Sequence, residues 1–355
     1  MTAAQAGAKI RVLVVDDSVV IRHLLRQALQ EDSGIEVVGS EANGVAALAR
    51  IPQVSPDVVT LDIEMPEMDG LQTLREIRKR HPRLRTIMFS TLTTRGAAAT
   101  FEALSSGADD YVAKSPNVGA LDQSLAALRS ELVPKVKQFF SLRRPAAAPL
   151  KPSVSGASPN RNGFAKPKIV AIGVSTGGPQ ALAEVIPRLP AGFPVPIVIV
   201  QHMPPTFTRL LAERLDSISP LKVEEAADGM ELAAGRVLVA RGDHHLQVRG
   251  DEGSARALLD QGPQENSCRP SVDVLFRSLA ESHRGAVLSV VLTGMGSDGL
   301  RGTQALKSRG AFSLAQDEAS SIVWGMPGAI VQAGLADRVV PLNQIAPEII
   351  RLAGR

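Results

Sequence analysis

The N-terminal third of the chain alternates short apolar runs with amphipathic stretches, and this alternation strongly constrains the fold. Each apolar run has the length of a strand buried on both faces, and each stretch after it has the apolar spacing of a helix. Strands that alternate with helices form parallel sheets with helices on both faces. The pattern therefore predicts a doubly wound parallel α/β domain. The expected strands are 10–15, 35–39, 57–61, 86–89 and 110–113.

Polar side chains follow these strands at the edge where ligands bind in such sheets. Three are carboxylates, which repel one another unless a hard cation lies among them, and Mg²⁺ with oxygen ligands suits them. A single aspartate at a strand end is more often a cap, but the whole set is hard to explain as caps. The residues are Asp16, Asp17, Asp62, Ser90 and Lys114.

The segments around these residues, VVDDS at 14–18 and LDIEMPEMDG at 61–70, resemble the receiver domain of two-component response regulators. The resemblance implies a flavodoxin-like fold and a phosphoryl group transferred to Asp62 from the phosphohistidine of a chemotaxis-type histidine kinase. It also implies a set of supporting roles. Mg²⁺ would be held by Asp16, Asp17 and Asp62, the phosphoryl oxygens would be bound by Ser90 and Lys114, and the aromatic switch position would be Tyr111.

One departure from the receiver pattern is visible. Receivers usually have proline directly after the conserved lysine, whereas here Ser115 stands between Lys114 and Pro116. The insertion puts the usual cis peptide in doubt, but not the role of Lys114.

The length of 355 residues predicts two domains. A proline-, alanine- and serine-rich segment at 138–167 is the expected flexible linker, between a receiver at 1–137 and a second domain at 168–355. Six basic residues and no acidic one lie between Leu142 and Ile169, so without these six the net charge of +3 becomes −3. The positive charge thus belongs to the linker, which argues against a nucleic-acid partner. A plain tether is the simpler interpretation; attraction to an acidic partner is the alternative.

The second domain is expected to begin with a strand, a glycine-rich turn and a helix at Lys168–Pro179, read as KIVAIGVSTGGP. Ser175 lies in the turn, where its hydroxyl can be exposed beside backbone N–H groups, as in a nucleophile elbow. A phosphate-cradling loop in which Ser175 only caps the helix remains an alternative.

Two further strands of this domain end at catalytic residue types. His202 follows the strand at 195–200, and Asp298 follows the strand at 286–292. A hydroxyl needs a base to become a nucleophile, and the imidazole needs a carboxylate to set its tautomer. If the three strands share a sheet, Ser175, His202 and Asp298 meet at one edge. Each residue also has a plainer interpretation, His202 as a packing histidine and Asp298 as a helix N-cap.

The segments IGVSTGGP at 172–179, QHMP at 201–204 and LTGMGSDG at 292–299 resemble the signature blocks of chemotaxis protein-glutamate methylesterases, and RPSVDVLF at 269–276 is similar to another block. The resemblance implies Ser175 as nucleophile, His202 as base and then acid, and Asp298 as the orienting carboxylate. It adds the Met295 amide as an oxyanion donor; the Thr176 amide, which follows the nucleophile, is a further candidate of our own. No metal is expected in this second, α/β methylesterase domain, which should also carry a short hairpin.

The implied function is phosphorylation-activated hydrolysis of glutamate γ-methyl esters, and deamidation of glutamines, on methyl-accepting chemotaxis receptors. By the same resemblance, the unphosphorylated receiver would cover the Ser175 site. A non-enzymatic, phosphorylation-dependent adaptor is the alternative, and the complete triad argues against it. A DNA-binding regulator would need a basic helix-turn-helix, and none is evident. The absence of a long apolar run or secretory leader favours a cytoplasmic protein recruited to membrane receptor clusters, without direct membrane insertion.

Overall fold

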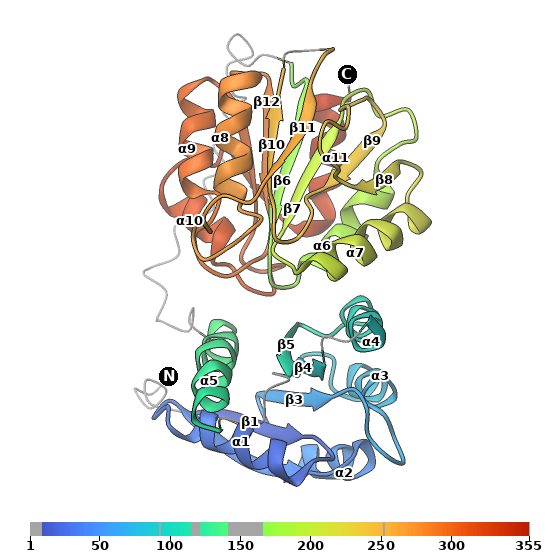
Figure 1. Cartoon of the computed structure of the whole chain (residues 1–355), viewed down its shortest axis with the longest axis vertical. Helices are drawn as coiled ribbons and strands as arrows, with labels where there is room; N and C mark the ends of the chain where they lie inside the picture. Colours follow the sequence, from blue (N-terminus) through green and yellow to red (C-terminus); the bar gives the residue numbers. More distant parts are fainter. Residues whose placement is uncertain (1–8, 92–93, 115–120, 141–165, 251–252, 355) are drawn as a thin grey trace. The chain divides into compact units, whose positions relative to one another are not determined.

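The computed structural model describes residues 9–91, 94–114, 121–140, 166–250 and 253–354. The chain divides into two units, Met1–Leu150 and Lys151–Arg355, and each is built on its own parallel sheet (Figure 1). The prediction of two doubly wound parallel α/β domains is confirmed. The lysine–proline departure at Ser115 and most of the predicted linker, 141–165, lie outside the described residues.

The first unit is a five-stranded sheet in the order β2-β1-β3-β4-β5, with every neighbouring pair parallel. Apolar residues of the strands form a core with α1 and α5, which pack against each other on the same face. The elements are β1 (Ile10–Val15), α1 (Val19–Gln30), β2 (Ile35–Glu41), α2 (Gly44–Val54), β3 (Val58–Asp62), α3 (Gly70–Arg80), β4 (Arg85–Thr91), α4 (Thr94–Ser105), β5 (Asp110–Lys114) and α5 (Leu121–Gln138).

The last helix of this unit runs past the expected domain boundary. Gln138, the first residue of the predicted linker, is buried and donates from its amide to Asp110 at 3.0 Å. Phe139 and Phe140 pack against the core of the first unit. Because these side chains contribute to the core, the first unit includes residues 138–140 as well.

The second unit is a seven-stranded parallel sheet in the order β14-β13-β12-β6-β7-β9-β8, with the predicted hairpin as a separate antiparallel pair, β10 and β11. The elements are β6 (Ile169–Val174), α6 (Gly178–Val185), the 3₁₀ turn η1 (Ile186–Arg188), β7 (Ile197–Gln201), α7 (Pro205–Ile218), β8 (Lys222–Glu225), β9 (Arg236–Val239), β10 (His245–Arg249), β11 (Arg256–Asp260), α8 (Val272–Ser282), β12 (Val287–Val291), α9 (Leu300–Ser308), β13 (Phe312–Gln316), α10 (Met326–Gln332), β14 (Arg338–Val340) and α11 (Leu342–Ala353).

The order of strands places a topological switch point at β6. The chain first extends the sheet from β6 through β7 on one side, and later through β12 on the other (Figure 1). Helices that start at such a point diverge to opposite faces, and the carboxyl ends of the strands are left open for a ligand. The three strands that meet there are the three that the sequence analysis assigned to catalysis.

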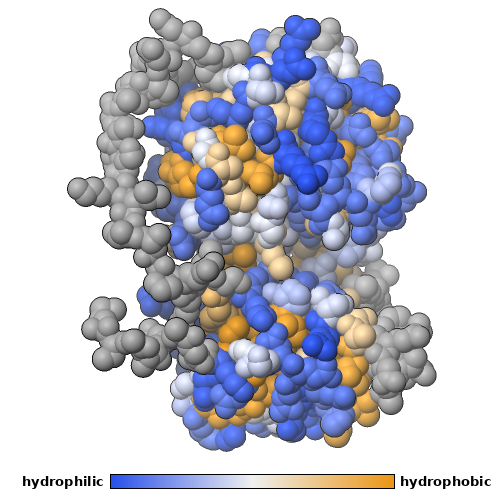
Figure 2. Space-filling model, turned by 90° about the vertical axis from the view of Figure 1, so that its left-hand side faces the viewer, coloured by the Kyte–Doolittle hydropathy of each residue, from blue (hydrophilic) through white to orange (hydrophobic). Residues whose placement is uncertain are grey.

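The surface is mostly hydrophilic on the face drawn in Figure 2, where apolar residues gather in separate small areas. Within the described part of the chain, no helix combines the length and the hydrophobicity needed to cross a bilayer. Large apolar side chains that are nevertheless well exposed are Val19, Val20, Val45, Met295 and Val339.

Candidate functional site

The turn after β6 presents Ser175 at the open end of the sheet. Gly177 has a φ of +78°, a left-handed conformation that favours glycine, and it immediately precedes helix α6. The amide of Ser175 donates to Thr293 O at 3.0 Å, and the carbonyl of Ser175 accepts from Gly178 N at 2.8 Å. These bonds occupy the backbone groups of Ser175 and fix the turn, while the side chain stays half-buried.

The loop after β12 closes against this turn. A Cβ atom on Gly294 would lie 2.7 Å from Ser175 Cβ, so only glycine allows the two segments to approach this closely. Asp298, four residues further along the same loop, is buried. The switch point therefore brings the ends of β6 and β12 together, as the sequence predicted.

His202 and Asp298 form the closest pair in the site. The imidazole Nε2 lies 2.8 Å from Asp298 Oδ2, and both side chains are largely shielded from solvent. Burial opposes the charged imidazole, but hydrogen bonds to Asp298 and Cys268 raise the pKa of His202 to about 9. Burial likewise opposes the charged carboxylate, yet His202 and backbone N–H groups lower the pKa of Asp298 to about 2. Asp298 is thus an anion at any working pH.

Asp298 is held by more donors than the sequence analysis identified. Its Oδ2 also accepts from the Val272 amide at 2.7 Å. Its Oδ1 accepts from two side chains and two backbone amides: Asn266 Nδ2 (2.8 Å), Ser271 Oγ (2.9 Å), Asp273 N (3.1 Å) and Gly299 N (3.1 Å). Ser271 lies in the RPSVDVLF segment, so this segment supplies hydrogen-bond donors to the Asp298 carboxylate. The resemblance of the segment to the family did not by itself assign a role to its residues. Nothing in the local pattern around Asn266 marked it.

Two hydrogen bonds join the chain around Ser175 to the chain around His202. His202 N donates to Val174 O at 3.3 Å, and Gln201 Nε2 donates to Ser175 O at 3.0 Å. Among the described residues, no hydrogen bond links the Ser175 hydroxyl to the imidazole. The imidazole Nδ1 instead lies 3.5 Å from Cys268 Sγ, a neighbour that the sequence did not indicate.

The two expected oxyanion donors are the amides of Met295 and Thr176. Each amide belongs to a peptide plane whose carbonyl oxygen accepts two hydrogen bonds. Gly294 O, in the plane of the Met295 amide, accepts from Gly325 N at 3.0 Å and Met326 N at 2.8 Å. Ser175 O, in the plane of the Thr176 amide, accepts from Gly178 N and Gln201 Nε2. In a planar trans peptide the N–H points opposite to the C=O, so the direction of both amides is determined by these bonds.

In the first unit, Lys114 links two buried carboxylates. Its Nζ lies 2.9 Å from Asp16 Oδ2 and 2.8 Å from Asp62 Oδ2. Burial raises the pKa of Asp62 to about 6, against the opposing effect of Lys114. Asp62 also lines a pocket of about 210 Å³ at the open edge of the sheet. Asp17, Ser90 and Lys114, which the sequence analysis placed at this edge, line the same pocket.

Three acidic residues at this edge of the sheet suit a hard cation. One oxygen each from Asp16, Asp17 and Asp62 lies within 4.8 Å of the others, and carboxylate oxygens are the ligands that Mg²⁺ prefers. Arg22 donates to Asp16 O at 2.7 Å and Asp17 O at 2.9 Å, which fixes the loop that carries two of the three carboxylates.

Tyr111 lies on the same sheet as this pocket but does not line it. Its ring packs under Lys135 Nζ, 4.8 Å from the ring centroid, and burial raises its pKa well above the usual range.

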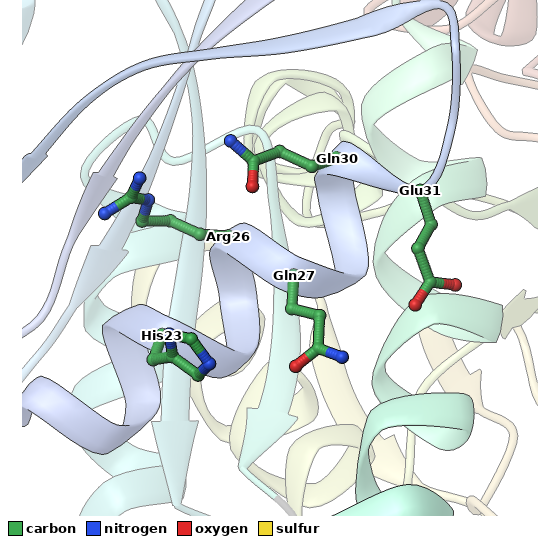
Figure 3. A pocket seen from close by; sticks show the side chains of 5 residues that line it. All are labelled: His23, Arg26, Gln27, Gln30 and Glu31. Carbon is green, nitrogen blue, oxygen red and sulfur yellow. The ribbon is translucent and has the colours of Figure 1, made fainter.

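A larger surface depression, of about 410 Å³, lies along α1 (Figure 3). The side chains that line it extend from one helix and its end, and none is a strand-end residue. They are His23, Arg26, Gln27, Gln30 and Glu31. We assign no chemistry to this depression.

Comparisons with known proteins match both units of the chain. Residues 170–349 match the family model described as CheB methylesterase, and residues 12–126 match that of the response regulator receiver domain. The chain is 49% identical, over 98% of its length, to proteins called protein-glutamate methylesterase/protein-glutamine glutaminase from Trichodesmium erythraeum and a Nocardioides species, covering 99% and 96% of them. Among solved structures, the CheB methylesterase catalytic domain of Thermotoga maritima aligns with a TM-score of 0.51 and 45% identity, over 53% of this chain and 100% of that one.

Proposed function

The chain belongs to the CheB family of receiver-linked protein-glutamate methylesterases/protein-glutamine glutaminases, and we propose how its own residues carry out these two hydrolyses. The substrate is a γ-methyl glutamate ester, or a glutamine, on a methyl-accepting chemotaxis receptor. The enzymatic activity of the family leaves the adaptor alternative without support. The observation that carries the proposal is the His202–Asp298 pair beside Ser175 at the switch point.

The first half-reaction transfers the acyl group to the enzyme. Because Asp298 holds Nε2 of His202, the hydroxyl proton of Ser175 goes to the other ring nitrogen, Nδ1, which exchanges its 3.5 Å contact with Cys268 Sγ for the Ser175 hydroxyl. Ser175 Oγ then attacks the ester carbonyl carbon, and the amides of Met295 and Thr176 stabilise the tetrahedral oxyanion. His202 returns the proton to the leaving oxygen, and methanol departs. With a glutamine substrate, the proton goes to nitrogen and ammonia leaves.

The second half-reaction releases the product. His202 takes a proton from water, whose oxygen attacks the acyl-enzyme carbonyl, and the proton then passes to Ser175 Oγ as the ester bond breaks. The receptor glutamate and the free enzyme are restored. No metal takes part in this proposed sequence.

Asp62 is the proposed phosphoryl acceptor of the first unit, with the receptor-coupled histidine kinase as donor. Asp16, Asp17 and Asp62 would hold Mg²⁺, which when bound neutralises charge on the incoming phosphoryl group. Lys114 and Ser90 would bind the phosphoryl oxygens. We propose that this modification raises the rate of the Ser175 site and that Tyr111 responds to it. The enzyme would then act where receptors cluster at the membrane.

The switch can be tested through methanol release from methylated receptor membranes. In wild type, Mg²⁺ with a small-molecule phosphodonor should raise the rate. In Asp62→Asn the basal rate should remain and the stimulation should disappear, because the phosphoryl acceptor is gone. Asp57→Asn is a matched control, since Asp57 lies immediately before β3, at its amino end, where it accepts from Arg11 N at 3.0 Å. Stimulation that persists in Asp62→Asn would contradict the proposed acceptor.

The rate should also depend on pH, since His202 must be neutral to act as a base. Its folded-state pKa of about 9 lies above the ordinary 6.5, so kcat/KM should rise about tenfold per pH unit below the pKa and level off near pH 9. The same shift stabilises the fold: the contribution is complete below pH 6.5 and is lost as pH rises through about 9. Methanol release would be measured with the Ser175→Ala rate subtracted, to remove alkaline ester hydrolysis. A rate that is flat between pH 6 and 8 would exclude His202 as the base.

A further inference from the structure

Gln201 is the last residue of β7, directly before His202, and its side chain is almost completely buried. Its amide Nε2 donates to two backbone carbonyls, Ser175 O at 3.0 Å and His202 O at 3.3 Å. One side-chain group therefore joins the turn of the proposed nucleophile to the backbone of the proposed base.

The orientation of this amide follows from its neighbours. If oxygen and nitrogen were exchanged, the oxygen would face two carbonyl oxygens at hydrogen-bond distance, an arrangement that repels. The nitrogen therefore faces Ser175 O and His202 O. The oxygen, Oε1, is buried and has no hydrogen-bond partner among the described residues. A buried acceptor without a hydrogen-bond partner lowers the stability of the fold. The position of the Gln201 amide is therefore kept despite a cost in stability.

Gly178, the first residue of α6, is what allows the amide to lie there. A Cβ atom at this position would be 1.8 Å from Gln201 Oε1. Glycine at 178 therefore lets the helix start and the glutamine amide occupy adjacent space. The same residue donates from its N–H to Ser175 O at 2.8 Å, so two donors hold that carbonyl.

We propose that Gln201 is a positioning residue for the reaction: by holding Ser175 O, it sets the peptide plane of the Thr176 amide and the relation of Ser175 to His202. The planar trans peptide transmits the constraint, because the N–H of Thr176 points opposite to the carbonyl that Gln201 binds. This inference rests on the proposed roles of Ser175 and His202. Its energetic effect should fall on the transition state, where an oxyanion forms, more than on substrate binding.

The first test removes the donor group, and a matched control accompanies it. Gln201→Met keeps the size and removes the donor, so kcat should fall about 10- to 100-fold while KM changes by less than about threefold. Gln247→Met makes the same chemical change in the hairpin, where the glutamine amide bonds only Asp260 among the residues that the structure describes, and should leave kcat unchanged. Melting temperatures of all variants would identify any loss that comes from unfolding.

Gln201→Glu gives a signature that a purely structural role would not produce. A protonated carboxyl can still donate to Ser175 O, whereas a carboxylate would face two carbonyl oxygens. Burial raises the pKa of such a carboxyl above its ordinary value of about 4.3. The kcat ratio of variant to wild type should therefore be highest near pH 5 and fall as pH rises, although the wild-type rate itself rises over this range.

Gly178→Ala provides an independent variant, since its Cβ would displace the Gln201 amide. It should lower kcat as Gln201→Met does, and the double variant should lose little more, because both changes break the same contact. Additive losses in the double variant, a Gln201→Glu ratio independent of pH, or a wild-type kcat in Gln201→Met would each overturn the inference. The Ser175→Ala enzyme distinguishes failure of the proposed function from failure of this inference. If Ser175→Ala is active, the proposed function fails. If Ser175→Ala is inactive while the Gln201 variants have normal activity, only this inference fails.

Discussion

Ser175→Ala should lower methanol release from methylated receptors by at least about 10⁴-fold, because it removes the atom that forms the acyl-enzyme. The turn itself should survive. Its geometry depends on the Ser175 backbone groups, Gly177 and Gly178, and not on the hydroxyl. Among the described residues the hydroxyl makes no bond to the imidazole, so its loss should leave His202 and Asp298 in place. KM for the receptor should therefore change little.

The control for this experiment is Ser313→Ala on β13. Ser313 is buried in the same sheet, and its hydroxyl has no hydrogen-bond partner among the described residues. Removing it deletes the same atom without touching the switch point, and activity should stay near wild type. A serine-directed fluorophosphonate should label wild type and Ser313→Ala but not Ser175→Ala. If Ser175→Ala kept a tenth of the wild-type rate, Ser175 would not be the nucleophile.

The fold was predictable because its strands are buried on both faces. In β3, β6, β7, β12 and β13 every residue is buried, so apolar residues predominate in each sequence. Only β6 is apolar throughout; Thr60, Ser289 and Ser313 interrupt β3, β12 and β13. Boundaries were less predictable. The α5 helix contains Pro134 yet continues to Gln138. Its last turn packs against the hydrophobic core of the first unit, and this packing outweighs the local sequence signals that favoured a linker from residue 138.

The site was predictable to the extent that its residues follow strands. Each catalytic candidate comes directly after a strand or in the loop that follows one: Ser175 after β6, His202 after β7 and Asp298 after β12. The switch point brings the carboxyl ends of these strands together. Asn266 and Cys268 could not be found in this way. They lie in an irregular segment between the hairpin and α8, and Asn266 has a φ of +53°. Their contacts with Asp298 and His202 depend on how that segment folds back, which no periodic pattern encodes.

Asp298→Asn should lower kcat by about 10⁴-fold, through the tautomer of His202. Four donors converge on Oδ1, so the asparagine oxygen should take that position and its NH₂ group should replace Oδ2. His202 Nε2 would then face a donor and would have to accept, which moves the ring proton to Nδ1. An imidazole that is protonated at Nδ1 cannot take the Ser175 proton. Loss of the carboxylate also lowers the pKa of His202 from about 9, so any residual activity should level off at lower pH.

Asp273→Asn is the matched control, because Asp273 is equally buried and neighbours Asp298 but does not touch the imidazole. Its carboxylate accepts from Gly302 N at 2.6 Å and Asn266 Nδ2 at 2.9 Å. Neutralising it removes a nearby negative charge while the His202–Asp298 pair persists, so kcat should fall by less than about tenfold. The imidazole N–H signals in NMR spectra, recorded above the His202 pKa of about 9 so that the ring is neutral, should show the exchanged tautomer only in Asp298→Asn. Equal losses in the two variants would mean that Asp298 acts through the fold of the loop, and would remove it from the proposed triad.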